Sequence, residues 1–85
     1  MEYIIVAFRS RTQTVKLSQI LQSMGVACEI VNTPKEAGVG CGLSVKISNF
    51  NFERVKSVVF GMGFSAFAGF FAVKITAGKK FVRSI

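Results

Sequence analysis

The apolar and polar residues of the chain follow two spacings, one typical of strands and one typical of helices. Residues 2–8 form a β-branched and aromatic run that predicts a buried first strand. Apolar residues at helical spacing then predict a first helix over residues 11–24, which Gly25 would end. Ser10 and Gln13 have the spacing of a capping box at the start of this helix.

Two strands, a second helix and a last strand are expected to follow. Residues 26–32 predict the second strand, and residues 43–48 alternate between apolar and polar, which predicts a third strand with one face in solvent. Asn51 is a suitable cap for a second helix that carries an apolar stripe. Residues 67–75 predict the last strand, and the pattern assigns no structure to the basic residues 76–85.

The predicted order, β-α-β-β-α-β, is that of the ferredoxin-like fold. We therefore expect one α+β domain over residues 1–75, with an antiparallel four-stranded sheet, both helices on one face, and a basic C-terminal tail. Right-handed crossovers would place the first and third strands in the middle of the sheet. The other face would be open, with Tyr3, Ile5 and Ala7 on the first strand and Ser44, Lys46 and Ser48 on the wet side of the third. Such a face either stays solvated or supports a homodimer, and we favour the homodimer because association stabilises a small core.

Length and charge indicate the number of domains and the kind of partner, but not the activity. A chain of 85 residues has room for a single domain. The 11 Lys and Arg residues exceed the 4 carboxylates, for a net charge of +7. This balance serves solubility or favours acidic partners, such as nucleic acid, anionic lipid or an acidic protein. The cations cluster only in the tail, at Lys79, Lys80 and Arg83.

The two cysteines and the absence of histidine exclude a disulfide scaffold and a zinc site. Such a chain suits a reducing cytosol, and its first residues lack the features of a signal peptide, so we expect a cytoplasmic protein. The segment Ser57–Val73 carries no charge. Gly61 and Gly63 within it indicate the end of a helix before a strand, so we expect no membrane span.

Cys41 is the strongest candidate for chemistry. It falls in the expected loop over residues 33–42, between the second and third strands. Because the chain has no imidazole to take a proton, Cys–His and Ser–His catalysis are excluded. Gly38, Gly40 and Gly42 alternate along the loop, and such glycines can leave backbone N–H groups free to hold an anion.

The residues that precede these glycines would support the thiol. Lys35 would lower the pKa of the Cys41 thiol, Glu36 would orient Lys35, and Pro34 begins the segment. The alternative is an ordinary connecting loop that contains a cysteine, because glycine and proline are common loop residues. Cys28 is expected to be a packed thiol in the second strand. A redox pair of the two cysteines stays open, although their spacing matches no redox motif.

The residues around the loop resemble a known family. The chain opens with Tyr3–Ser10 (YIIVAFRS) and continues with Thr33–Glu36 (TPKE) and Gly40–Leu43 (GCGL). Over about residues 3–75, this pattern resembles the family of putative selenium/sulfur carrier-like proteins. The Pro-Lys-Glu segment that leads to Cys-Gly-Leu is the most specific part of the resemblance.

The resemblance implies a carrier that works through Cys41. The thiol would take a sulfur or selenium atom from a donor protein and pass it to an acceptor protein, without a cofactor or a metal. The chain departs from the family by continuing past its last expected strand and by the phenylalanine-rich segment from Phe60 to Phe71. It also lacks the Cys-Pro-x-Pro segment of the better-characterised bacterial sulfur carriers.

Other function classes stay open. A regulatory or interaction module without chemistry fits the same fold, because one fold hosts many functions. A nucleic acid-binding module fits the charge, but residues 43–48 contain no aromatic residue on which a base could stack, which argues against it. An enzyme with its own active site is not indicated, because the carboxylates fall on separate expected elements. These are Glu2, Glu29, Glu36 and Glu53.

Overall fold

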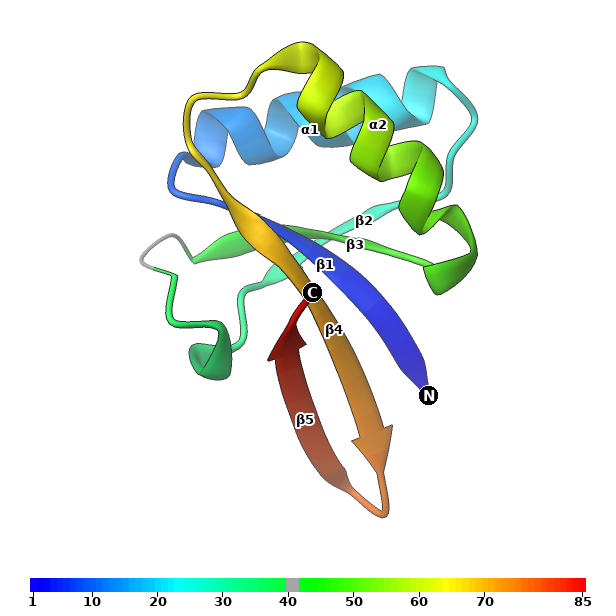
Figure 1. Cartoon of the computed structure of the whole chain (residues 1–85), viewed down its shortest axis with the longest axis vertical. Coiled ribbons are helices and arrows are strands. Elements are labelled where there is room, and N and C mark those ends of the chain that lie inside the picture. Colours follow the sequence, from blue (N-terminus) through cyan, green and yellow to red (C-terminus); the bar gives the residue numbers. More distant parts are fainter. Residues whose placement is uncertain (40–41) are drawn as a thin grey trace.

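A computed structural model describes residues 1–39 and 42–85 as an antiparallel sheet with two helices packed on one of its faces (Figure 1). The α+β class is therefore confirmed. In chain order the elements are β1 (Glu2–Phe8), α1 (Arg11–Ser23), β2 (Glu29–Asn32), the 3₁₀ turn η1 (Lys35–Ala37), β3 (Leu43–Ile47), the 3₁₀ turn η2 (Asn49–Asn51), α2 (Phe52–Met62), β4 (Phe67–Thr76) and β5 (Lys79–Ser84).

The strand order in the sheet is β2-β3-β1-β4-β5, and all neighbours are antiparallel. The prediction that the first and third strands lie inside the sheet is confirmed. The prediction of a four-stranded sheet was wrong, because a fifth strand lies beyond β4. Most of the segment 76–85, expected as a basic tail, forms this strand and pairs with β4 from Phe71↔Ser84 to Thr76↔Lys79.

A two-residue turn explains why β5 forms. Ala77 and Gly78 connect β4 to β5, with φ angles of 52° and 77°. Positive φ at both central residues is the geometry of the type I′ turn, whose twist matches that of a hairpin. The sequence signal was weak because the favoured first residue of this turn is Asn or Asp, and here it is Ala. The hairpin extends from the lower edge of the sheet in Figure 1.

The start of α1 follows the capping box only in part. The Ser10 hydroxyl accepts a hydrogen bond from the Gln13 backbone N–H at 3.3 Å, so the predicted cap is confirmed. The Gln13 side chain turns elsewhere: it donates to Ser65 Oγ at 2.9 Å and accepts from the Ala66 N–H at 2.8 Å. It therefore fastens the first turn of α1 to the connection between α2 and β4.

Asn51 stands at the N-cap position of α2, as predicted, but its side chain makes no capping hydrogen bond. Ser48 Oγ instead accepts from the Phe50 N–H at 3.2 Å and starts the preceding turn η2. Gly63, with φ at 63°, ends α2 as the glycine pattern predicted. The uncharged segment Ser57–Val73 is thus divided between α2, a turn and β4. Within residues 1–39 and 42–85, no helix is long and apolar enough to cross a membrane.

The main core lies between the helices and the sheet. Phe8 of β1 is fully buried there, and its ring meets Phe64 and Phe67 edge to face, with centroids 5.0 and 6.0 Å apart. These contacts explain part of the phenylalanine-rich segment, which supplies rings to this core. The buried cluster consists of Ile4, Val6, Phe8, Leu17, Leu21, Val26, Val45, Ile47, Val55, Val59, Phe70 and Ala72.

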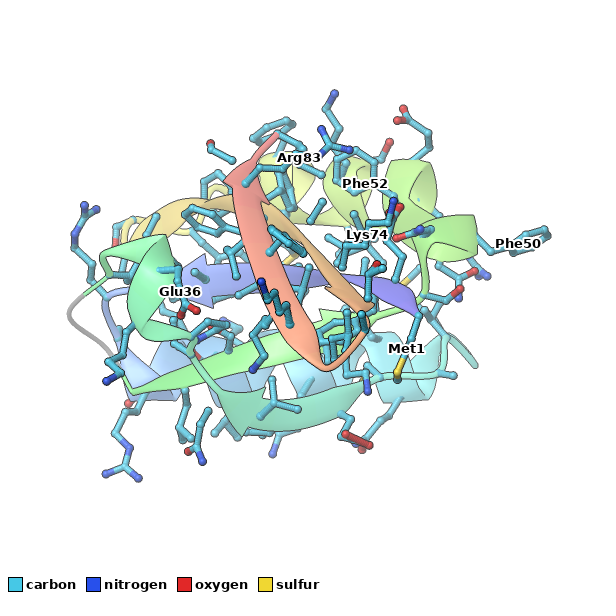
Figure 2. The ribbon with its side chains drawn as sticks, turned by 90° about the horizontal axis from the view of Figure 1, so that it is seen from below. Met1, Glu36, Phe50, Phe52, Lys74 and Arg83 are labelled. Carbon is cyan, nitrogen blue, oxygen red and sulfur yellow. The ribbon has the colours of Figure 1, made fainter. Side chains whose placement is uncertain are left out.

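The opposite face of the sheet is covered as well. Ile5, Ala7 and Val73 lie on it and are fully buried. Seen from that side, the edge strand β5 and the turn η1 lie in front of the other strands (Figure 2), and the two elements contact each other. Ser44, which was expected on the wet face, is also fully buried, so the prediction was wrong for this residue, whereas Lys46 is half-buried and Ser48 is exposed. The face that was expected to be open, and so to favour a homodimer, is therefore covered within the chain.

Candidate functional site

The loop that contains Cys41 is closed at its base by two hydrogen bonds. The last pair of the β2–β3 ladder is Asn32↔Leu43. Just beyond it, the Thr33 N–H donates to the Gly42 carbonyl at 2.9 Å. The Thr33 and Ser44 hydroxyls lie 2.6 Å apart, a hydrogen bond in which either can be the donor. Both ends of the loop are therefore held together.

The first half of the loop forms one tight turn. Pro34 is extended and half-buried, and its carbonyl accepts from the Ala37 N–H at 3.1 Å. The Gly38 N–H donates to the Lys35 carbonyl at 3.0 Å and so closes η1. Gly38 has φ at 68°, where a residue with a Cβ would be strained. Glycine is therefore required at position 38 by the backbone conformation of this turn.

The structure places most of the predicted site residues, but not the thiol itself. Lys35 and Glu36 are both exposed on η1, and in the described part of the chain they form no ion pair with each other. Gly42 is exposed and its Cα faces open space. Cys41 and Gly40, the predicted reactive residue and one of its supports, lie outside the described residues.

A buried threonine connects this loop to the first helix. Thr14 is fully buried in α1, and its hydroxyl lies 3.3 Å from the Leu43 carbonyl and 3.1 Å from the Ser10 carbonyl. The residue after Gly42 is therefore held against the first turn of α1. Nearby, the Arg9 N–H donates to the Ala66 carbonyl at 2.7 Å. Three connections, β1–α1, β2–β3 and α2–β4, thus meet at one end of the sheet.

This end of the sheet is positively charged. Arg9 and Arg11 flank the start of α1, Lys35 lies on η1, and all three side chains are exposed. Over residues 1–39 and 42–85, no Lys or Arg forms an ion pair with a carboxylate, so these charges are not neutralised from within. The described residues also contain no group of three His, Cys, Asp or Glu side chains that could hold a metal ion.

Cys28 has the packed environment that its sequence predicted. Its sulfur lies 3.8 Å from Ser18 Oγ and donates to the Ser18 carbonyl at 3.6 Å. The side chain is half-buried against the main core. Cys28 precedes β2, which begins at Glu29 and is shorter than the strand expected over 26–32. Its thiol is free of a disulfide.

Sequence reasoning missed the three hydroxyl residues that hold the loop. Thr14 lies four residues after the Ser10 cap, where a threonine can reach back to a carbonyl. Thr33 and Ser44 face each other because Asn32 pairs with Leu43. No local pattern marks this contact, since it depends on the register of two strands and on the cover over the second sheet face.

Comparison with known proteins relates these features to a family. The family model described as "Putative Se/S carrier protein-like" matches residues 2–65, which include β1 to α2 and the loop around Cys41. The chain belongs to this family. Searches among curated proteins and among solved structures gave no match. The resemblance to this Se/S carrier family expected from the sequence is thus confirmed, and the match ends before β4 and β5.

Proposed function

We propose that this protein carries sulfur or selenium on the thiol of Cys41. Its membership of the Se/S carrier family is the observation that supports this function most directly. The matched residues include the segment Gly40–Leu43, in which Cys41 is the only group that can accept a sulfur atom. Cys28 is less suited to the task, because it is half-buried and its thiol is engaged by Ser18.

The proposed reaction is an exchange between a thiolate and a persulfide. The Cys41 thiolate attacks the outer sulfur of a donor persulfide, so that a new S–S bond forms on Cys41 as the S–S bond of the donor breaks. The donor leaves as a thiolate, and there is no net oxidation. A nucleophile of the acceptor then attacks the same outer sulfur, and Cys41 leaves as a thiolate. Selenium would follow the same path through an S–Se bond.

The described residues support this chemistry by shape and by charge. The bonds at Thr33 hold the ends of the loop together, and Thr14 holds its exit against α1. Lys35 supplies an exposed positive charge on η1, which would favour the thiolate and the persulfide anion. Arg9 and Arg11, at the same end of the sheet, would favour an acidic surface on the donor or acceptor protein.

Such exchange starts from a free thiolate on Cys41, and a reducing compartment keeps this thiol from being oxidised to a disulfide. We therefore propose that the protein works in the cytoplasm, between a donor and an acceptor protein. The exposed position of Lys35 and Glu36 is consistent with a loop that both partners can reach. Glu36 would act on Lys35 through the local field, since the two side chains make no direct ion pair in the described structure.

The carrier function can be tested with a small persulfide donor. The purified protein is treated with glutathione persulfide, and intact and peptide mass spectrometry locate any added sulfur. We expect one added sulfur on Cys41, its loss in Cys41→Ser, and its retention in the matched variant Cys28→Ser. Labelling of Cys28 instead, or unchanged labelling of Cys41→Ser, would show that the protein is not a carrier through this thiol. No labelling at all would favour an interaction module.

A further inference from the structure

The hairpin of β4 and β5 gathers cations around an exposed aromatic ring. Phe81 pairs with Lys74 across the hairpin, and residues directly opposite each other share one face of a sheet. Lys79 and Arg83 lie two residues before and after Phe81, so they share this face too. All four side chains are exposed, and Figure 2 shows those of Lys74 and Arg83 on the hairpin. We call this set the hairpin face.

Among residues 1–39 and 42–85, no carboxylate pairs with the cations of the hairpin face and no other ring packs on Phe81. Phe81 is 56% exposed and, in the described part of the chain, its ring contacts no other ring and no cation. No Asp or Glu follows Glu53 in the sequence, so the hairpin has no acidic side chain. Phe81 therefore differs from Phe8 or Phe70, whose rings are packed in the core.

The lack of an aromatic residue on β3 argues against base stacking on that strand, but β5 carries a ring of its own in Phe81. In the fold most of residues 76–85 form the strand β5, in which Phe81 lies in line with Lys79 and Arg83 and opposite Lys74 of β4. Phe81 has a cation about 6.8 Å away along the strand on either side, because two residues of an antiparallel strand span that distance. An extended polynucleotide repeats a flat base and a charged phosphate at each step, which matches such a row.

We propose that the hairpin face binds single-stranded nucleic acid. A base would stack on Phe81, and Lys74, Lys79 and Arg83 would contact the neighbouring phosphates. Single strands fit better than a duplex, because the stacking faces of a duplex are already used by its own bases. The site lies outside the part of the chain that matches the Se/S carrier family, so the proposal does not depend on the carrier function.

Fluorescence anisotropy with labelled oligothymidine of about twelve nucleotides tests this proposal, since that length spans a typical single-strand site. With three phosphate contacts we expect the logarithm of affinity to fall with that of salt with a slope of about −2, or about 20-fold between 50 and 200 mM. Phe81→Ala should weaken binding by about 5- to 150-fold without changing this slope. Phe81→Trp should retain binding, because it keeps a stacking ring and so separates stacking from hairpin stability.

Matched controls use exposed residues elsewhere. Phe50 is 93% exposed and projects away from the hairpin (Figure 2), so Phe50→Ala should bind as tightly as the unchanged protein. Lys79→Gln should reduce the slope to about −1.4, while Lys16→Gln on α1, with the same change of charge, should not.

Absence of binding at low salt would overturn the proposal. So would equal effects of Phe81→Ala and Phe50→Ala on affinity, or equal effects of Lys79→Gln and Lys16→Gln on the salt slope. Displacement of the oligonucleotide by polyglutamate at equal charge concentration would also overturn it. The last outcome would point to an acidic protein as the partner. Cys41→Ser should bind the oligonucleotide normally, so failure of the carrier function and failure of this site are distinguished by separate variants.

Discussion

The hydroxyl oxygens of Thr33 and Ser44 lie 2.6 Å apart across the base of the loop that contains Cys41. Ser44 is fully buried, and Thr33 is half-buried beside it. Buried hydroxyls are normally hydrogen-bonded, and here each supplies the partner of the other. This pair therefore ties the first residue of the loop to β3 at a place where water has little access.

A double-mutant cycle on this pair tests its coupling. Thr33→Val leaves the buried Ser44 hydroxyl without its partner, and Ser44→Ala does the same to Thr33. We expect each single change to lower the free energy of unfolding by about 1–3 kcal/mol. The double variant should lose less than the sum, because no unpaired hydroxyl is left behind. Urea unfolding measures all four proteins, and strictly additive losses would show that the two hydroxyls do not interact.

Thr14 offers a test of how the loop exit is held against α1. Thr14→Val keeps the shape of the side chain but removes the hydroxyl that contacts the carbonyls of Ser10 and Leu43. We expect the free energy of unfolding to fall by about 1 kcal/mol. Thr12→Val, an identical change at an exposed position of the same helix, should stay within about 0.5 kcal/mol. Equal effects would mean that only helix propensity had changed.

The ring of Phe8 organises the core beside the candidate site. It is fully buried and meets Phe64 and Phe67 edge to face. Phe8→Ala should lower the free energy of unfolding by about 3–5 kcal/mol, through lost burial and the cavity left behind. Phe50→Ala deletes the same ring at an exposed position, so it should change the free energy of unfolding by less than about 0.5 kcal/mol. Thermal unfolding followed by circular dichroism gives both values, and similar melting temperatures would contradict the described packing.

Local patterns were sufficient to predict the helices and the inner strands. The strand at Glu2–Phe8, buried from Ile4 onward, and the Ser10 cap both appear where their residue types predict them. The remaining features depend on contacts between distant segments. Gln13 bonds to Ser65 and Ala66, more than fifty residues away, because the α2–β4 connection offers better partners than its own helix end.

The position of the candidate site in a loop could be predicted from the sequence, but the hydrogen bonds that hold the loop could not. The glycines, Pro34 and Lys35 marked it, and the turn at Gly38 follows from them. Its closure by Thr33 and Ser44 could not be foreseen, because a serine in an alternating strand is typical of a solvated face. Ser44 is fully buried on the face in front of which β5 and η1 lie, and β5 itself depends on a turn that starts with an unfavourable residue.

That turn gives a prediction of increased stability. Ala77 has φ at 52°, in the left-handed region, which costs an ordinary residue about 1–2 kcal/mol. Asn tolerates this region and leads the favoured Asn-Gly turn, so Ala77→Asn should raise the free energy of unfolding by about 0.5–1 kcal/mol. Gly78→Ala, at φ of 77°, should lower it by about 1–2 kcal/mol. Urea midpoints compare the variants, and a loss of stability in Ala77→Asn would contradict the assigned turn.

The charge of Lys35 is expected to act on the reactivity of Cys41. If η1 favours the thiolate, Lys35→Gln should slow alkylation of Cys41 by iodoacetamide about 2- to 5-fold, the range given by exposed charge interactions of up to about 1 kcal/mol. Both proteins are prepared with Cys28→Ser, so that a single thiol reacts. Lys16→Gln on α1 has the same net charge and should react as the parent does. The difference between the two variants should shrink as salt rises, because exposed charges are screened. Equal alkylation rates for both variants at low salt would show that Lys35 does not act on Cys41. The backbone N–H groups of the loop would then be the remaining candidates for stabilising the thiolate.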